Sequence, residues 1–224
     1  MSAALKAARP GDVLTLKNGE WKDAKIVVNH GGEPDQPVTL RAEAPGRVVL
    51  NGASLLEINA PYVNVEGLLF RGGAISHGSV IQFNSHHGVV RETAVVDYNP
   101  AAFATKYYWA FFQGDHNLIE RCYFKGKNHL DPVIGNGLED SRHNRVAHSF
   151  FRDMPAASAN GREIIRVWGS GKYEGREDDG AFFTIEGNLF DHADGEGAEI
   201  ISLKSNHNVV QNNTVVATLG CINI

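Results

Sequence analysis

The sequence contains little cysteine, little proline and no long apolar run. Its two cysteines, Cys122 and Cys221, are too few for a disulfide framework and form no metal-binding motif, so we expect both to be packed side chains. The absence of 18 consecutive apolar residues excludes a membrane-spanning helix and gives no sign of a membrane partner. The N-terminus lacks a signal-peptide pattern. Eight prolines against 24 glycines indicate a chain with many turns.

An excess of positive charge is also missing. The formal net charge is −5, which argues against a nucleic acid partner because phosphate binding normally needs a basic face. An anionic polysaccharide stays open as a partner if positive charge gathers locally. With 42% apolar residues, the 224-residue chain can bury a core as one or at most two domains.

Short apolar segments recur along the chain with a period near 25 residues. Six of them align on one reference position each, at intervals of 25 to 39 residues: Val65, Val90, Ile119, Val146, Ile185 and Val210. A second apolar position lies seven residues before four of these: Ile58, Phe83, Phe112 and Leu203. Two registers that repeat together predict stacked coils, because one coil cannot bury its inward face alone. The sequence therefore predicts an all-β fold, a parallel β-helix that forms a single domain over residues 1–224.

The repeat also predicts a helix at the N-terminal end of the solenoid, a stack of histidines at one turn and a surface loop. The residues 3–8 are expected to form one or two helical turns that cover an exposed end of the solenoid. Four histidines fall at the same turn of different coils, and we expect them to stack as a ladder rather than to bind metal: His87, His116, His143 and His207. The longest interval contains a Gly-rich, charged segment, 169–180, which is expected to be a surface loop.

The outward face of two late strands carries the residues best suited to chemistry. If Val167 and Leu203 occupy the same place on successive coils, the alternation of strand side chains pairs their outward neighbours. These pairs are Arg166 beside Ser202 and Trp168 beside Lys204. An aromatic ring next to an arginine suits a sugar that bears a carboxylate. The entrance of this face holds amide and carboxylate oxygens, which suit Ca²⁺: Asn160, Glu163, Glu196 and Glu199.

Three pieces of the sequence resemble polysaccharide lyase family 6. They are Pro10-Gly-Asp12, Asn160-Gly-Arg-Glu-Ile-Ile-Arg166 and Glu199-Ile-Ile-Ser-Leu-Lys-Ser205. The family consists of right-handed parallel β-helix lyases and includes alginate lyases and dermatan-cleaving enzymes of the chondroitinase B type. Its members are usually longer, so the resemblance implies that this chain is an N-terminal portion of the catalytic β-helix.

The resemblance implies β-elimination on a uronic acid polymer, with alginate as the favoured substrate. Lys204 would be the base that abstracts the C5 proton. Substrate-binding residues would be Arg166, Trp168 and Ser202. Ca²⁺ would neutralise the uronate carboxylate and would be held by Asn160, Glu199 and an upstream glutamate, Glu196. Arg162 and its aliphatic flank also favour alginate over a dermatan-type polymer. A polymer cannot enter a cell intact, so we expect a bacterial protein that is secreted or periplasmic.

The sequence departs from the family pattern at two places. Two residues separate Glu196 from Glu199 where the family has one, so Glu196 reaches the cation only if the turn bulges. The family also places an arginine one coil after the lysine. By our register Leu203 matches Ile224, so the residue beside Lys204 would follow Ile224, and the chain is expected to be truncated before the last part of the active site.

Two other classes of function remain open from the residues alone. One is a non-catalytic carbohydrate-binding β-helix or an inactive lyase fragment. The other is a β-helix glycoside hydrolase, which needs an acid and a base carboxylate across the scissile bond. We find no outward carboxylate pair on adjacent coils of this face, and the Asp178-Asp179 pair lies on the expected loop. Release of an unsaturated, ultraviolet-absorbing sugar would distinguish the lyase from both.

Overall fold

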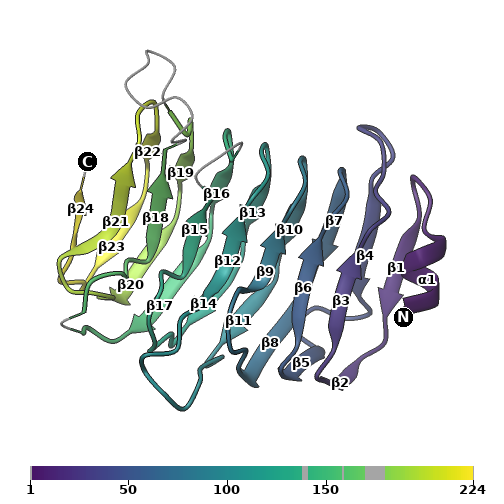
Figure 1. The fold of residues 1–224 in the computed structure, drawn as a ribbon, viewed down its shortest axis with the longest axis horizontal. Coiled ribbons are helices and arrows are strands. Elements are labelled where there is room, and N and C mark those ends of the chain that lie inside the picture. The colour runs from purple at the N-terminus through teal and green to yellow at the C-terminus, as the bar shows by residue number, and fades with distance from the viewer. Residues whose placement is uncertain (1, 138–140, 158, 170–179, 224) are drawn as a thin grey trace.

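The chain folds into a solenoid of parallel strands, which confirms the predicted all-β parallel β-helix. The computed structural model describes residues 2–137, 141–157, 159–169 and 180–223. Within these residues there is one short helix, α1 (Ser2–Ala7), which lies across the N-terminal end of the solenoid as expected (Figure 1). None of the described helices is long and apolar enough to cross a bilayer.

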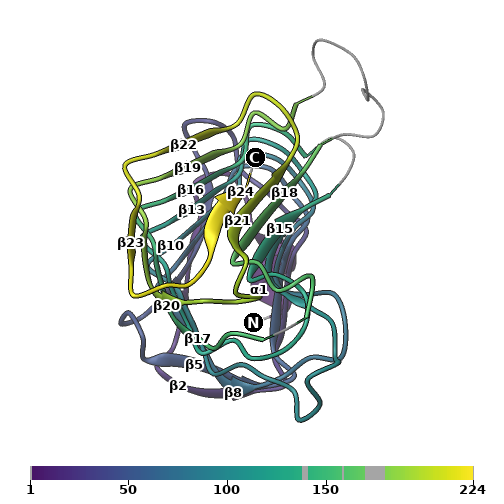
Figure 2. The ribbon, with the colours of Figure 1, turned by 90° about the vertical axis from the view of Figure 1, so that its left-hand side faces the viewer.

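Each coil contributes one strand to each of three sheets (Figure 2). The first sheet contains β1 (Val13–Leu16), β4 (Val38–Ala42), β7 (Val63–Glu66), β10 (Val89–Arg91), β13 (Leu118–Glu120), β16 (Arg145–Ala147), β19 (Thr184–Glu186) and β22 (Val209–Gln211). The second contains β2 (Gly19–Lys22), β5 (Val48–Gly52), β8 (Leu68–Gly73), β11 (Ala94–Val96), β14 (Tyr123–Lys125), β17 (Phe150–Met154), β20 (Leu189–Ala193) and β23 (Thr214–Val216). The third contains β3 (Lys25–Val28), β6 (Leu55–Ile58), β9 (Ser79–Phe83), β12 (Tyr108–Phe112), β15 (Ile134–Asn136), β18 (Ile165–Trp168), β21 (Glu199–Lys204) and β24 (Cys221–Asn223).

The predicted register holds along the first sheet. The six reference positions of the repeat pair with one another in chain order, each with the next: Val65, Val90, Ile119, Val146, Ile185 and Val210. All but the last are fully buried. The register of pairing is fixed because successive side chains point to opposite faces of the sheet. A slip by one residue would turn the buried side chains outward.

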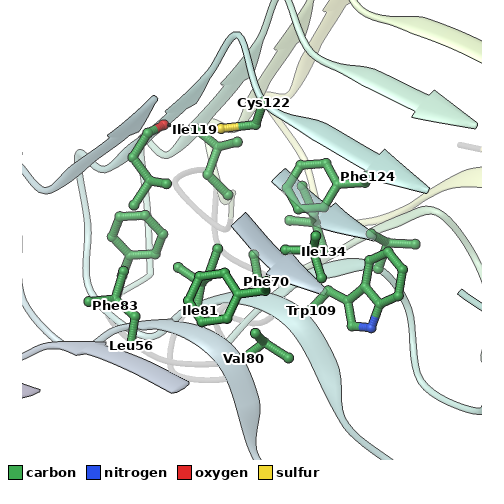
Figure 3. Packing of buried hydrophobic residues seen from close by; sticks show 14 of the residues in the cluster. Leu56, Phe70, Val80, Ile81, Phe83, Trp109, Ile119, Cys122, Phe124 and Ile134 are labelled. Carbon is green, nitrogen blue, oxygen red and sulfur yellow. Dashed lines mark hydrogen bonds between the residues drawn. The ribbon is translucent and has the colours of Figure 1, made fainter. Parts of the chain in front are cut away.

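The core consists of apolar side chains that pack against one another inside the solenoid (Figure 3). Phe124, Phe151 and Phe190 stack with ring centroids 5.1 and 4.9 Å apart, and Phe83 lies 4.8 Å from Phe112. These distances match the spacing of about 4.8 Å between hydrogen-bonded strands, so parallel pairing brings equivalent residues into contact. Full burial of one such ring contributes roughly 1.5–3 kcal/mol.

The turns between the third and first sheets carry the predicted histidine ladder. His87, His116 and His143 stack with ring centroids 5.0 and 4.7 Å apart. Phe182 continues the stack 5.0 Å from His143, and His207 follows 4.8 Å from Phe182. All five residues have φ between 48° and 58°, a left-handed conformation that lets the chain turn between sheets. The ladder prediction is confirmed, with a phenylalanine in one place.

The structure corrects the expectation for one cysteine. Cys122 is packed in the core, but Cys221 is exposed. Cys221 belongs to β24, whose partner strand within the described residues is β21. The expected loop over 169–180 lies almost wholly outside the described residues, and so does the Asp178-Asp179 pair.

Candidate active site

β18 and β21 place four of the predicted site residues on one face of the third sheet. Arg166 pairs with Ser202, and Trp168 pairs with Lys204, as the repeat predicted. Val167 is fully buried, whereas the residues on either side of it are partly exposed. Because strand side chains alternate in direction, these four side chains start from the outer face of the solenoid.

Arg166 lies at the centre of this face and contacts three side chains. Its guanidinium carbon is 5.0 Å from the centre of the Trp168 ring. Its Nη1 lies 3.6 Å from Glu163 Oε2, and its Nη2 donates a hydrogen bond of 2.8 Å to Tyr108 Oη. The arginine therefore lies between an acidic group and two aromatic rings, an arrangement suited to an anionic sugar.

Three carboxylates gather beside Arg166. One oxygen each of Glu163, Glu196 and Glu199 lies within 4.8 Å of the others. Glu163 precedes β18 and Glu199 begins β21, so the two come from adjacent coils. Glu163 is buried, so the two do not form the outward carboxylate pair that a glycoside hydrolase would need. Alternation along the strand did not indicate their proximity, because Glu163 precedes the regular strand.

A glycine turn brings Glu196 into the acid cluster. Gly195 and Gly197, on either side of it, have φ of 57° and 83°, values that glycine adopts without strain. Glu196 Oε2 then accepts a hydrogen bond of 2.9 Å from the backbone N–H of Gly161. The turn thus accommodates the extra residue between Glu196 and Glu199, and the spacing does not keep Glu196 away from the other two carboxylates.

Glu163 is the most buried of the three carboxylates. Its side chain is 3% exposed, and in the described part of the chain its Oε2 has no hydrogen-bond partner. Burial raises the pKa of Glu163, and the charges of Glu196 and Glu199 add to this rise while Arg166 opposes it. A buried carboxylate oxygen without a donor is unfavourable. The residues therefore fit a hard divalent cation such as Ca²⁺, which prefers oxygen ligands.

Glu199 connects the acid cluster to Lys204. The Ser202 hydroxyl is the main cause of the lowered pKa of Glu199, although Ser202 Oγ lacks the geometry of a full hydrogen bond. Asn223 Nδ2 donates to Glu199 Oε1 at 2.5 Å, and Lys204 Nζ lies 3.7 Å from Glu199 Oε2; both also lower this pKa. Glu199 is therefore ionised at neutral pH and anchors the lysine.

The remaining predicted residues lie in different surroundings. Lys204 is exposed, whereas Ser202 is fully buried, so its contact with substrate stays a prediction. Asn160 is exposed and directly precedes Gly161, which binds Glu196, so it lies at the edge of the acid cluster; its role as a ligand also stays a prediction. Arg162 is buried and donates to backbone carbonyls, so the argument that it favours alginate is wrong.

Sequence reasoning missed two residues of this site. Asn223 pairs with Ser202 in the β21–β24 ladder. This pair is one residue before the predicted match of Leu203 with Ile224. The register could therefore have indicated Asn223. Tyr108 gave no comparable signal, because it reaches Arg166 across the intervening strand β15.

The fold and the site define the class: a parallel β-helix protein with a lysine, an arginine and clustered carboxylates on one sheet face. The sequence profile of the chondroitinase B family matches residues 1–224. No curated protein sequence matches the chain. Among solved structures, a family 6 polysaccharide lyase from Pseudopedobacter saltans is 50% identical, with a TM-score of 0.96 over 99% of this chain and 52% of its own.

Two further lyases show the same likeness. A mutant of the family 6 alginate lyase AlyGC is 30% identical, with a TM-score of 0.89 over 98% of this chain and 31% of its own. A mannuronic acid specific family 6 lyase from human gut microbiota is 25% identical, with a TM-score of 0.87 over 98% of this chain and 54% of its own. This chain belongs to polysaccharide lyase family 6. It spans between about a third and about half the length of these three relatives.

Proposed function

We propose that the chain is part of a lyase that cleaves a uronic acid polymer, alginate, by β-elimination, with Lys204 as the base. The observation that carries this proposal is the position of Lys204 Nζ, 3.7 Å from Glu199 in the acid cluster. Arg166 and Trp168 on the neighbouring strand complete a surface for an anionic sugar. Alginate is supported by the relatives described as alginate lyase and as mannuronic acid specific.

The reaction needs a base next to a group that stabilises negative charge. In its neutral form, Lys204 takes the C5 proton of a uronate residue, and the electron pair left on C5 forms the C4–C5 double bond. The bond between C4 and the glycosidic oxygen breaks, and the oxygen leaves with the neighbouring sugar and takes a proton from water, while Lys204 returns its proton to the solvent. The products are an unsaturated uronate end and a new hydroxyl end.

The acid cluster would hold Ca²⁺ through Glu163, Glu196 and Glu199, with Asn160 beside them. The ion would neutralise the uronate carboxylate and stabilise the negative charge that develops when C5 loses its proton. Arg166 supplies a second positive charge on the same face, and the Trp168 ring offers an apolar surface to the sugar. Because the polymer is too large to enter a cell, we propose that the parent protein acts in the periplasm or outside the cell.

The proposal is tested by the ultraviolet absorbance of unsaturated product when the full-length protein acts on alginate. Lys204→Ala should lower kcat at least about 100-fold, because general bases typically contribute roughly 10²–10⁴-fold. A chelator should also lower the rate, and added Ca²⁺ should restore it. Lys25→Ala is the matched control, because Lys25 is an exposed lysine on β3 of the same sheet.

The outcome separates the candidate functions. Product release that depends on Lys204 but not on Lys25 supports the lyase. Cleavage without an unsaturated product would identify a glycoside hydrolase instead. Binding of alginate without any cleavage by the full-length protein would identify a carbohydrate-binding β-helix.

A further inference from the structure

Tyr108 lies across the outer face of β15, in a space that a glycine leaves open. A Cβ placed on Gly135 would lie 2.6 Å from Cε1 of Tyr108, closer than real Cβ atoms come to other heavy atoms. Gly135 has no positive φ, so its backbone conformation does not demand glycine. The lack of a side chain at this position is therefore explained by the tyrosine ring that covers it.

This position lets Tyr108 join an aromatic row to the proposed site. Its ring centre lies 4.7 Å from that of Phe111, and its hydroxyl accepts the 2.8 Å hydrogen bond from Arg166. Phe111, Gly135 and Arg166 are consecutive partners in the strand ladder, so the row continues from β12 to β18. Both rings are only partly buried, which leaves apolar surface on the outside of the solenoid.

Arg166 lies at the β18 end of this row. Its Nε is buried and has no hydrogen-bond partner in the described part of the chain, and its Nη1 forms an ion pair with Glu163 at 3.6 Å. Two partly exposed aromatic rings offer an apolar surface to the C–H face of a sugar ring, and the nearby Arg166 guanidinium adds positive charge that favours a uronate over a neutral sugar.

We propose that Tyr108 and Phe111 form an additional subsite, which binds a uronate residue remote from the one that Lys204 deprotonates. The inference rests on the proposed function. β12 lies three strands from β21 in the sheet, which corresponds to roughly 14 Å at the usual strand spacing. Tyr108 reaches back to Arg166, but Phe111 stays over β12, so a dimer bound at Lys204 does not span the whole subsite and longer chains gain most from it.

The test measures binding of oligouronates of increasing length to the full-length protein by calorimetry. Lys204→Ala serves as the background, so that the ligands are not cleaved. Tyr108→Leu should weaken binding of a hexamer by roughly 3- to 10-fold, the usual worth of an aromatic contact, and leave binding of a dimer within twofold. Gly135→Ala should give the same pattern, because its Cβ displaces the tyrosine ring. Tyr108→Phe should retain most of the hexamer affinity.

The matched control is Tyr123→Leu. Tyr123 is a partly buried tyrosine of the second sheet whose ring packs on Phe150 at 5.3 Å, and it lies away from the proposed site. Circular dichroism and thermal unfolding check that each variant is folded. Equal losses for dimer and hexamer would mean that Tyr108 only positions Arg166, and an unchanged hexamer affinity would mean that the subsite is absent. If the background protein binds neither length, the proposed function itself fails.

Discussion

Glu163 is the residue on which the chemistry of the acid cluster depends most. It is buried, one of its oxygens lacks a hydrogen-bond donor, and two other carboxylates lie close to it. This arrangement resembles the first coordination sphere of a hard cation, because no hydrogen-bond donor in the described part of the chain satisfies that oxygen and Arg166 approaches it only to 3.6 Å. A single amide substitution can therefore separate cation binding from the stability of the fold.

Glu163→Gln should weaken Ca²⁺ binding by roughly tenfold or more, because the charge of the ligands governs affinity for this ion. The unfolding free energy of the cation-free protein should not fall, since the substitution removes a buried negative charge next to two others. Isothermal titration with Ca²⁺ and urea denaturation in chelator measure the two effects. Glu57→Gln is the control, as Glu57 is a partly buried carboxylate on β6 of the same sheet. Equal Ca²⁺ affinity in both variants would remove Glu163 from the site.

At the scale of one element, the histidine ladder makes a turn sensitive to pH. Burial is the main cause of the lowered pKa of His87 and of His143, and the charge of the neighbouring His116 adds to it in both cases. The folded state therefore prefers neutral rings. Phe182 shows that an uncharged ring can occupy the same place in the stack at a positive φ.

The ladder should lose stability as the pH falls below about 6.5, the ordinary pKa of an unfolded histidine. The sign follows because a lowered pKa means that the unfolded chain binds protons more readily than the folded one. The double variant His87→Phe and His143→Phe should keep the stack. Its melting temperature should fall less between pH 7.5 and pH 5 than that of the parent protein. His77→Phe, an exposed histidine outside the ladder, should behave like the parent. A double variant as acid-sensitive as the parent would contradict the prediction.

At the scale of the element, the sequence predicted the pairing of strands but not every contact of the site. The pairing of Val65 with Val90, or of Arg166 with Ser202, follows from the repeat because parallel coils of constant register place equivalent residues together. The contact between Tyr108 and Arg166 does not follow, because it depends on a ring that crosses an intervening strand. The inclusion of Glu196 depended on a turn conformation, which a count of residues does not specify.

At the scale of the whole molecule, two buried basic side chains bind backbone carbonyls, and one of them, Arg162, joins several coils. Lys127 Nζ donates to the carbonyls of His129, Leu130 and Asp131. Arg162 donates to four carbonyls from three coils: Lys127, His129, Pro155 and Gly195. Backbone oxygens rather than carboxylates thus surround both charges. Burial, with Arg162 nearby, lowers the pKa of Lys127 well below its ordinary value. We infer that the pair stabilises the coils beneath the acid cluster.

Lys127→Met should therefore lower the free energy of unfolding by about 3 kcal/mol, because three backbone carbonyls lose the buried amine that donates to them. Urea denaturation measures the change. Lys125→Met is the matched control, since Lys125 lies two residues away at the surface and pairs with Asp153 at 3.5 Å; it should change stability by less than about 0.5 kcal/mol. A loss of equal size in both variants would show that the buried Lys127 contributes no more to stability than the surface Lys125.

The repeat of three strands in each coil also determines which insertions and deletions the fold can accommodate. Every strand in the described part of the chain pairs only with the strands one coil before and after it. Removal of one whole coil before β12 would shorten the solenoid by about 4.8 Å and leave β12 to β21 facing the same way. Removal of a third of a coil would shift each later strand into the next sheet and turn the lysine, the arginine and the carboxylates away from one another. A deletion in this solenoid therefore preserves the site when it removes whole coils and disrupts the site when it removes part of a coil.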